Sequence, residues 1–364
     1  MAADYEYEQI LEKARTMLMS MQRASWEQAL TAQCLYEWRA LAEIPTIIGL
    51  AYDMIARSDD LGRLGVRLNE IDLSSLDFCA IGEALNFLHH QTRDTLWLNA
   101  ARSLVGYIRR TASRSREGLL EHRAGELWVD ALYMLPPALV ACGSSWNQDH
   151  LIFEAFQQLN GYEKYLRNDE DGLWSQSWDI VKDTVSRKER LSTGNGWALA
   201  GSVRVLSLLP PGWQAEAAVL TKKILQTLTS ILKYQREDGF FHFILDDSTS
   251  FVETTSASMY AYTIYKLQFL QVLASDSPEV AAADRMREGL LTKIDDWGYL
   301  RGCVLARKDG HEDNLEGKGT SAEGQAFFIM TLASYQQARI GRDSRHKSIH
   351  LAEENPFSSH YEEI

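Results

Sequence analysis

The segment GNGWALAGSVRVLSLL, which spans residues 194–209, has the composition of a helix packed at the centre of a helical protein. A polar residue, Asn195, stands at its start, and small residues then recur among large apolar ones, which lets neighbouring helices approach closely. Five further segments share this pattern: SWEQALTAQCLYEW from Ser25, LDFCAIGEALNFLHH from Leu76, WVDALYMLPPALVACG from Trp128, ETTSASMYAYTIYKL from Glu253 and GTSAEGQAFFIMTLASY from Gly319. We therefore predict six inner helices of one kind.

The spacing of these segments predicts their connections. Successive starts lie roughly 50 to 65 residues apart, the length of an inner helix, a loop and an outer helix together. Amphipathic stretches such as residues 96–104 fall between them and suit outer helices. Glycine-centred elements, such as those at Gly172 and Gly239, predict tight turns that lead into short extended segments. The sequence thus predicts a mainly α fold, an (α/α)6 toroid of six helical hairpins, as one domain over residues 1–341 with a polar tail at 342–364.

Charge and composition exclude several classes of function. The 364 residues carry a formal net charge of −13, and no Lys/Arg cluster interrupts it, so nucleic acid is not expected as a partner. No apolar run has the length of a membrane span, and the acidic amino terminus does not resemble a signal peptide, so we predict a cytoplasmic protein without a membrane partner. The four cysteines lack zinc-binding spacing and are expected to be buried.

The inner helices of a toroid begin at one end, so polar residues at their starts are expected to surround a common cavity. These candidates are Trp26, Asp77, Asp130, Asn195, Trp197, Glu253, Thr320, Ser321 and Glu323. For most of them helix capping is an alternative role, because Asp, Ser and Thr at a helix start commonly accept backbone N–H bonds.

Asp130 is the candidate for catalysis, because apolar and aromatic residues flank it in WVDALYM. Such surroundings raise a carboxyl pKa by desolvation, which suits a general acid near neutral pH. Asp77 is the natural second carboxylate, and two acids facing one cavity can divide into a proton donor and a base, as in glycoside chemistry. Capping remains the alternative role for Asp130.

Aromatic residues crowd the same loops and could stack on a sugar ring, line an apolar pocket or belong to the core. They include Trp26, Trp128, Tyr133, Trp174, Trp178, Trp197 and Phe241. His122, His242 and His311 have no partner at metal-ligand spacing, so no metal site is predicted. Residues 309–314 carry scattered oxygen ligands without the spacing of a calcium loop.

Several segments, in order along the chain, resemble the unsaturated rhamnogalacturonyl hydrolases of glycoside hydrolase family 105, relatives of the family 88 unsaturated glucuronyl hydrolases. They are HRAGELWVDALYMLPPALVACG (122–143), DGLWSQSWD (171–179), TGNGWALAGSVRVLSLLP (193–210), DGFFHFILDD (238–247), ETTSASMYAY (253–262) and GTSAEGQAFF (319–328). The resemblance extends from about Trp26 to Tyr335 and implies an (α/α)6 barrel.

The resemblance also implies a reaction, hydration of the C4=C5 double bond of a terminal unsaturated uronic acid, without a metal or organic cofactor. Asp130 matches the general acid/base and Asp77 the second aspartate. On the same matches we predict ten substrate-binding residues: Trp26, Trp128, Tyr133, Met134, Gln176, Trp178, Thr193, Asn195, Trp197 and His242. Two positions depart from the family pattern, because Gln176 replaces the histidine of HGWD and Thr193 the arginine of RGNGW. Thr cannot supply the planar, charged donor that suits a carboxylate.

Three functions remain open from the sequence. The first is a hydrolase acting on an unsaturated uronyl oligosaccharide. The second keeps Asp130 but hydrates, dehydrates, isomerises or cyclises an apolar or uncharged metabolite, since an acid in an aromatic pocket can protonate any suitable alkene. The third is a binding protein on the same fold, because fold does not fix function. In each case the partner is a small molecule or an oligosaccharide.

Overall fold

Six inner and six outer helices alternate along the chain in a computed structural model that describes residues 2–66, 74–306 and 312–343. The inner helices are α2 (Ser25–Arg39), α4 (Gly82–Thr92, preceded by the short helix η1, Asp77–Ile81), α7 (Pro136–Trp146, preceded by α6, Ala131–Met134), α9 (Ser192–Leu208), α11 (Thr255–Phe269) and α13 (Ala322–Asp343). The outer helices are α1 (Ala2–Met19), α3 (Ile44–Ala56), α5 (Thr95–Arg110), α8 (Asp149–Leu166), α10 (Gln214–Ile231) and α12 (Pro278–Leu291), and another short helix, η2 (Leu232–Tyr234), follows α10.

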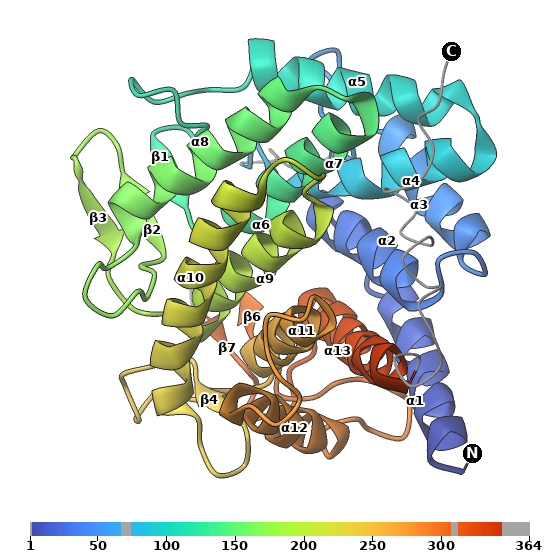
Figure 1. Cartoon of the computed structure of the whole chain (residues 1–364), viewed down its shortest axis with the longest axis vertical. Helices are drawn as coiled ribbons and strands as arrows, with labels where there is room; N and C mark the ends of the chain where they lie inside the picture. Colours follow the sequence, from blue (N-terminus) through green and yellow to red (C-terminus); the bar gives the residue numbers. More distant parts are fainter. Residues whose placement is uncertain (1, 67–73, 307–311, 344–364) are drawn as a thin grey trace.

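The inner helices form a closed ring, so the predicted toroid is confirmed. Each packs against the next along the chain, and α13 returns to contact α2 (Figure 1). All six segments that the sequence marked as inner helices occupy this ring. The third inner helix is interrupted by Pro136 and Pro137, which cannot continue α6 and begin α7 instead. This break places Asp130 at the entrance of a single short turn of helix.

The sixth outer helix is α1, which precedes the first inner helix and packs against α13. The spacing of the inner-helix segments does not predict a helix in this acidic N-terminal segment. A turn at Gly298, where φ is +98°, lies so close to α1 that a Cβ there would come within 2.6 Å of the Lys13 carbonyl carbon. Of the predicted tail, residues 342 and 343 extend α13, and residues 344–364 lie outside the described residues.

Short antiparallel strands occur in the loops beside the inner-helix starts. Strands β1 (Glu126–Trp128), β2 (Ser177–Asp179) and β3 (Thr184–Arg187) form one sheet, and two pairs are formed by β4 (Phe241–His242) with β5 (Val252–Glu253) and β6 (Leu305–Ala306) with β7 (Glu312–Asp313). The pairing of β1 with β2 brings the loop before Asp130 beside Gln176, although 46 residues separate them. These strands therefore position the site residues that the helices do not carry.

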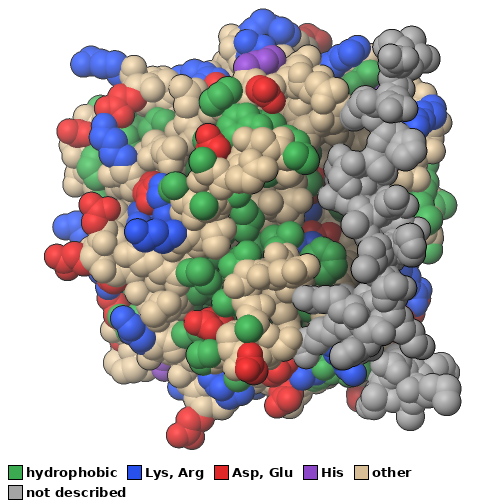
Figure 2. Space-filling view, in the orientation of Figure 1, with side chains coloured by type: hydrophobic (Ala, Val, Ile, Leu, Met, Phe, Trp, Pro, Cys, Tyr) green, Lys and Arg blue, Asp and Glu red, His purple; other side chains and the backbone are tan. Residues whose placement is uncertain are grey.

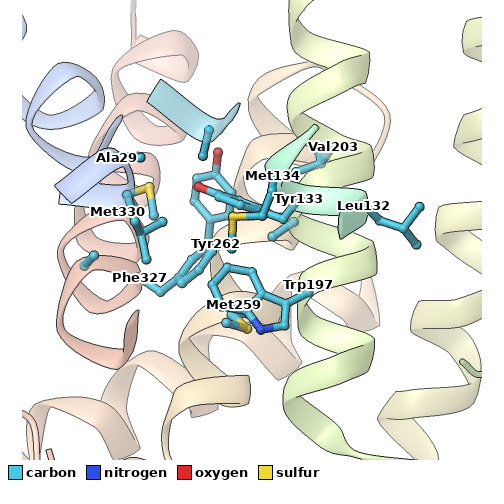
Figure 3. Close-up of a cluster of buried hydrophobic side chains, with 14 of the residues drawn as sticks. Ala29, Leu132, Tyr133, Met134, Trp197, Val203, Met259, Tyr262, Phe327 and Met330 are labelled. Atoms are coloured by element: carbon cyan, nitrogen blue, oxygen red, sulfur yellow. The ribbon is translucent and has the colours of Figure 1, made fainter. Parts of the chain in front are cut away.

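The ring is filled by large side chains from several inner helices, including Tyr133, Trp197, Met259 and Phe327 (Figure 3). It also contains a buried ionic cluster, formed by Arg204, Glu37, Glu83 and Lys266. Arg204 of α9 is 2% exposed and binds both oxygens of Glu83 of α4, with N–O distances of 2.9 and 2.6 Å. It also contacts Glu37 of α2, which Lys266 of α11 approaches to 3.3 Å. The cluster thus ties four inner helices together.

Figure 2 shows basic side chains scattered among acidic ones on the face of Figure 1, without a continuous basic band. Among the residues that the structure describes, no helix is long and apolar enough to span a bilayer. All four cysteines are buried and unpaired, as expected from their spacing.

Candidate active site

A cavity of about 430 Å³ opens where the inner helices begin. Its wall combines acidic, basic, aromatic and aliphatic side chains from every part of the ring. They are Trp26, Ser74, Asp77, His122, Arg123, Trp128, Asp130, Met134, Gln176, Leu191, Thr193, Trp197, Phe243, Thr255, Met259, Val304, Glu312, Ser321 and Glu323. Of the twelve residues predicted as catalytic or substrate-binding, eight are brought together here: Asp77, Asp130, Trp26, Trp128, Met134, Gln176, Thr193 and Trp197. The helix-start candidates Ser321 and Glu323 also line the cavity, whereas Thr320 does not.

Asp130 lies immediately before α6, and its side chain makes no capping hydrogen bond to that helix. Its Oδ2 instead accepts a hydrogen bond of 2.6 Å from Nε2 of Gln176. Burial raises the pKa of the Asp130 carboxyl, and the charge of Asp77 acts in the same direction, whereas His122 and the Gln176 bond oppose them. The net upward shift favours a protonated acid inside the cavity. The capping alternative therefore does not describe this side chain.

Asp77 is held differently, because it pairs with a buried histidine. Its Oδ1 lies 2.7 Å from Nε2 of His122, and Oγ of Ser74 accepts a bond from the Asp77 backbone N–H. Burial alone would raise the pKa of Asp77, but the charge and hydrogen bond of His122 outweigh it and lower that pKa. Burial likewise favours neutral His122, yet Asp77 raises the histidine pKa. The pKa values of the two carboxyl groups are thus shifted in opposite directions, which favours the protonated acid at Asp130 and the carboxylate at Asp77.

Arg123 is the one Lys or Arg among the described residues that line the cavity. Its guanidinium carbon lies 4.1 Å from the centre of the Trp128 ring, a cation–π contact that holds it against the wall. Within the described ranges it forms no ion pair, and its buried Nε has no hydrogen-bond partner. The cavity therefore contains a cation without a carboxylate partner in the described part of the chain.

Two further carboxylates reach the cavity, but each already has a partner. Glu312 of β7 receives two bonds from Arg187 of β3, at 2.6 and 3.0 Å, which joins two loops beside the opening. Glu323, at the start of α13, accepts a 2.6 Å bond from Nε1 of Trp26. These pairs fix the loops and the Trp26 ring.

Four predicted substrate-binding residues do not line the cavity. Tyr133 is buried below it, donates to Oε1 of Gln33 at 2.8 Å and packs on Trp197 (Figure 3). Asn195 clamps the backbone of Trp174, from which its Oδ1 accepts and to which its Nδ2 donates.

Trp178 packs on Tyr165 of α8, with the two ring centres 5.0 Å apart. His242 bonds the Ser250 carbonyl and Arg236, while Phe243, the residue that follows β4, lines the cavity. These four residues are not retained as candidates for substrate contact.

The sequence did not predict several other residues that line the cavity. From the sequence, His122 and Glu312 are considered only as possible metal ligands, and Arg123 is not placed at the site. Glu253, a start candidate, is buried and caps α11 by accepting bonds from the backbone of Thr255 and Ser256. His311 lies outside the described residues. Within the ranges the structure describes, no three His, Cys, Asp or Glu side chains are grouped to hold a metal ion.

Comparison with known proteins shows the same architecture. The chain is 24% identical over 242 residues to the unsaturated rhamnogalacturonyl hydrolase YesR of Bacillus subtilis (strain 168), covering 62% of this chain and 70% of that protein. A Salmonella enterica serovar Paratyphi A structure, described as a possible family 105 member, aligns with a TM-score of 0.77 at 18% identity, over 92% and 93% of the two chains. A family 88 structure from Bacteroides vulgatus aligns with a TM-score of 0.73 at 18% identity, over 92% and 98%.

The ring of helical hairpins is thus the fold of the helical-barrel glycoside hydrolases. The sequence profile of Glycosyl Hydrolase Family 88 matches residues 2–338, and the chain belongs to that family. The resemblance to families 105 and 88 is confirmed, and the protein is a glycoside hydrolase-type enzyme.

Proposed function

We propose that this enzyme hydrates the C4=C5 double bond of a terminal unsaturated uronic acid, with Asp130 as general acid and then general base. The observation that carries the proposal is the Asp130 carboxyl group, which faces the cavity, takes no part in capping and has a raised pKa. The name of the Bacillus subtilis relative, an unsaturated rhamnogalacturonyl hydrolase, supports the substrate class.

The reaction needs one group that gives a proton and then takes one back. Protonated Asp130 donates to C4 of the vinyl ether, and positive charge develops at C5. Water adds at C5 and passes a proton to the Asp130 carboxylate, which restores the acid. The hemiketal at C5 then opens to a ketone, which breaks the C5–O5 ring bond and leaves a hemiacetal at C1. Breakdown of this hemiacetal to an aldehyde breaks the bond from C1 to the neighbouring sugar, which leaves as an alcohol. Ionised Asp77 stabilises the developing positive charge, and His122 keeps Asp77 ionised.

Arg123 supplies the cation that a uronate requires and that Thr193 cannot provide. Its guanidinium lines the cavity wall, its charge acts on Asp77, and its planar fork suits a carboxylate. Trp128 beneath it holds the guanidinium in place. The loss of the arginine at position 193 is therefore compensated from the loop before β1.

Replacing Arg123 by Met is expected to raise KM for an unsaturated uronyl disaccharide about ten- to hundredfold, the weight of one charged hydrogen-bonded contact. Arg123→Lys keeps the positive charge but loses the planar guanidinium, so its KM should lie between those of wild type and Arg123→Met. Initial rates over a range of substrate concentrations measure the effect. An unchanged KM in Arg123→Met would remove this residue from substrate recognition.

Replacing Gln176 by Met removes the donor that stabilises the ionised form of Asp130. Since that bond lowers the pKa of Asp130, its loss should raise the pKa further. The enzyme starts its cycle with Asp130 protonated, so activity is lost as pH rises through this pKa. The alkaline limb of the pH–kcat/KM profile should therefore move to higher pH in Gln176→Met. A limb that stays in place, or moves to lower pH, would contradict the assignment of that limb to Asp130.

A second candidate substrate is an apolar or uncharged alkene. It is favoured by the aliphatic and aromatic part of the wall, formed by Leu191, Phe243, Met259 and Val304. Protonation by Asp130 would be the same, but Arg123 would have no partner on such a substrate. If the substrate is of this kind, the enzyme should turn over a neutral alkene, and Arg123→Met should leave the rate and KM of that reaction unchanged.

The proposal is tested with an unsaturated galacturonyl-rhamnose disaccharide, whose double bond absorbs in the ultraviolet. We expect wild-type enzyme to abolish this absorbance and release rhamnose, and Asp130→Asn to leave it nearly unchanged. Loss of absorbance without release of rhamnose would indicate isomerisation. No loss at high enzyme concentration would refute the uronyl function and leave the uncharged alkene as the candidate.

A further inference from the structure

A second cavity, of about 450 Å³, lies on the outside of the ring. It is a groove between the neighbouring outer helices α8 and α10, floored by α9 (Figure 1). The two cavities share one helix as a wall. Thr193 and Trp197 face the central cavity, whereas Ala198, Leu199 and Ser202 lie on the groove. The groove is therefore separate from the catalytic cavity.

Most of the groove is aromatic and aliphatic. Phe153 packs edge-on against Trp213 with ring centres 4.7 Å apart, and Phe156 lies nearly parallel to the same ring at 5.8 Å. Phe153 remains 57% exposed and Val219, across the groove on α10, 55% exposed. Large apolar side chains left open around a concave surface of this size are typical of a site for an apolar ligand.

One end of the groove carries an excess of positive charge. Lys223 of α10 and Arg167, just after α8, both bind the carboxylate of Glu163, so two cations share one anion. Lys223 also donates to Oδ1 of Asn160 and keeps 30% of its side chain exposed. Glu216, the other acidic residue of the lining, precedes Lys223 by seven residues, about 10 Å along the helix, toward the opposite end.

We propose that this groove binds an organic anion with an apolar body, with the acidic group at Lys223 and the body against Phe153, Trp213 and Val219. The excess cation selects a carboxylate or sulfonate, and the aliphatic side chains favour an alkyl or aryl body over a sugar. Such a ligand contacts the outer side of α9, whose first turn lies in the catalytic cavity. The site does not depend on the proposed hydrolase activity.

The test uses the aromatic sulfonate 8-anilinonaphthalene-1-sulfonate and the intact enzyme. We expect saturable fluorescence, and an affinity about tenfold weaker in Lys223→Met, which keeps the aliphatic stem but removes the charge. Phe153→Ser should also weaken binding, and its exposed position lets the fold persist, which circular dichroism checks. Lys182→Met is the matched control, because Lys182 is 76% exposed, pairs with Asp179 and lies outside the groove.

Displacement identifies the chemistry of the ligand. Octanoate should displace the probe, whereas octyltrimethylammonium of the same chain length should not. Equal affinity in Lys223→Met, Phe153→Ser and wild type would place the probe elsewhere and overturn the proposal. Equal displacement by the cationic detergent would overturn the anion selectivity. Sedimentation velocity at several protein concentrations measures self-association. If probe binding falls as the protein self-associates, a second copy covers the groove, and this result would also overturn the proposal.

Discussion

Asp130→Asn is expected to lower kcat on an unsaturated uronyl disaccharide by about 10²- to 10⁴-fold, the usual contribution of a general acid. The amide has nearly the shape of the carboxyl group but has no acidic proton to give to C4. It also cannot take a proton from the attacking water, so both halves of the cycle fail. Because the lost interaction belongs to the transition state, KM should change much less than kcat.

The control for this variant is the same substitution at a carboxylate outside the cavity. Asp296 is exposed in the turn after α12 and does not line the cavity, so Asp296→Asn is expected to keep wild-type activity. Thermal unfolding of both variants should match wild type, since the Asp130 side chain does not cap its helix. Wild-type turnover in Asp130→Asn would show that another group supplies the proton.

Arg204→Met is expected to produce the largest loss of stability, about 3 to 5 kcal/mol of the free energy of unfolding. The substitution leaves the carboxylates of Glu83 and Glu37 buried without their shared guanidinium. The cost arises from these uncompensated charges, because Met fills much of the same volume. Urea unfolding followed by circular dichroism measures it.

Arg285→Met is the matched control for Arg204→Met. Arg285 is exposed on α12, where its guanidinium bonds Gln235, and its loss should change stability by no more than about 0.5 kcal/mol. Equal unfolding midpoints for the two variants would show that the ionic cluster does not hold the inner ring together.

The fold was predictable because its signal repeats. Small residues placed among apolar ones mark each inner helix, and the even spacing fixes the number of hairpins. Helix α1 was missed because the outer helix of the last pair comes first in the chain. Its role depends on packing against α13, which no local pattern records.

The candidate site was predictable where residues lie on inner-helix starts and less so in loops. Thr193 and Trp197 are four residues apart and share one face of α9, so helical geometry already places Asn195 on another face. That reasoning could have removed Asn195 from the predicted site. His122, Arg123 and Glu312 come from connecting segments. The pairing of β1 with β2 joins distant residues next to His122 and Arg123, and Glu312 is bound by Arg187, 125 residues away along the chain.

The claim on which the mechanism depends is that protonated Asp130 delivers its proton to C4 of the substrate. The direct measurement is the reaction of the unsaturated disaccharide in D₂O, followed by NMR of the early product. We expect wild-type enzyme to give a product with one deuterium at C4, on a single face of the carbon. Asp130→Asn should form almost no labelled product. Deuterium on both faces of C4, or equal labelling by the variant, would contradict it.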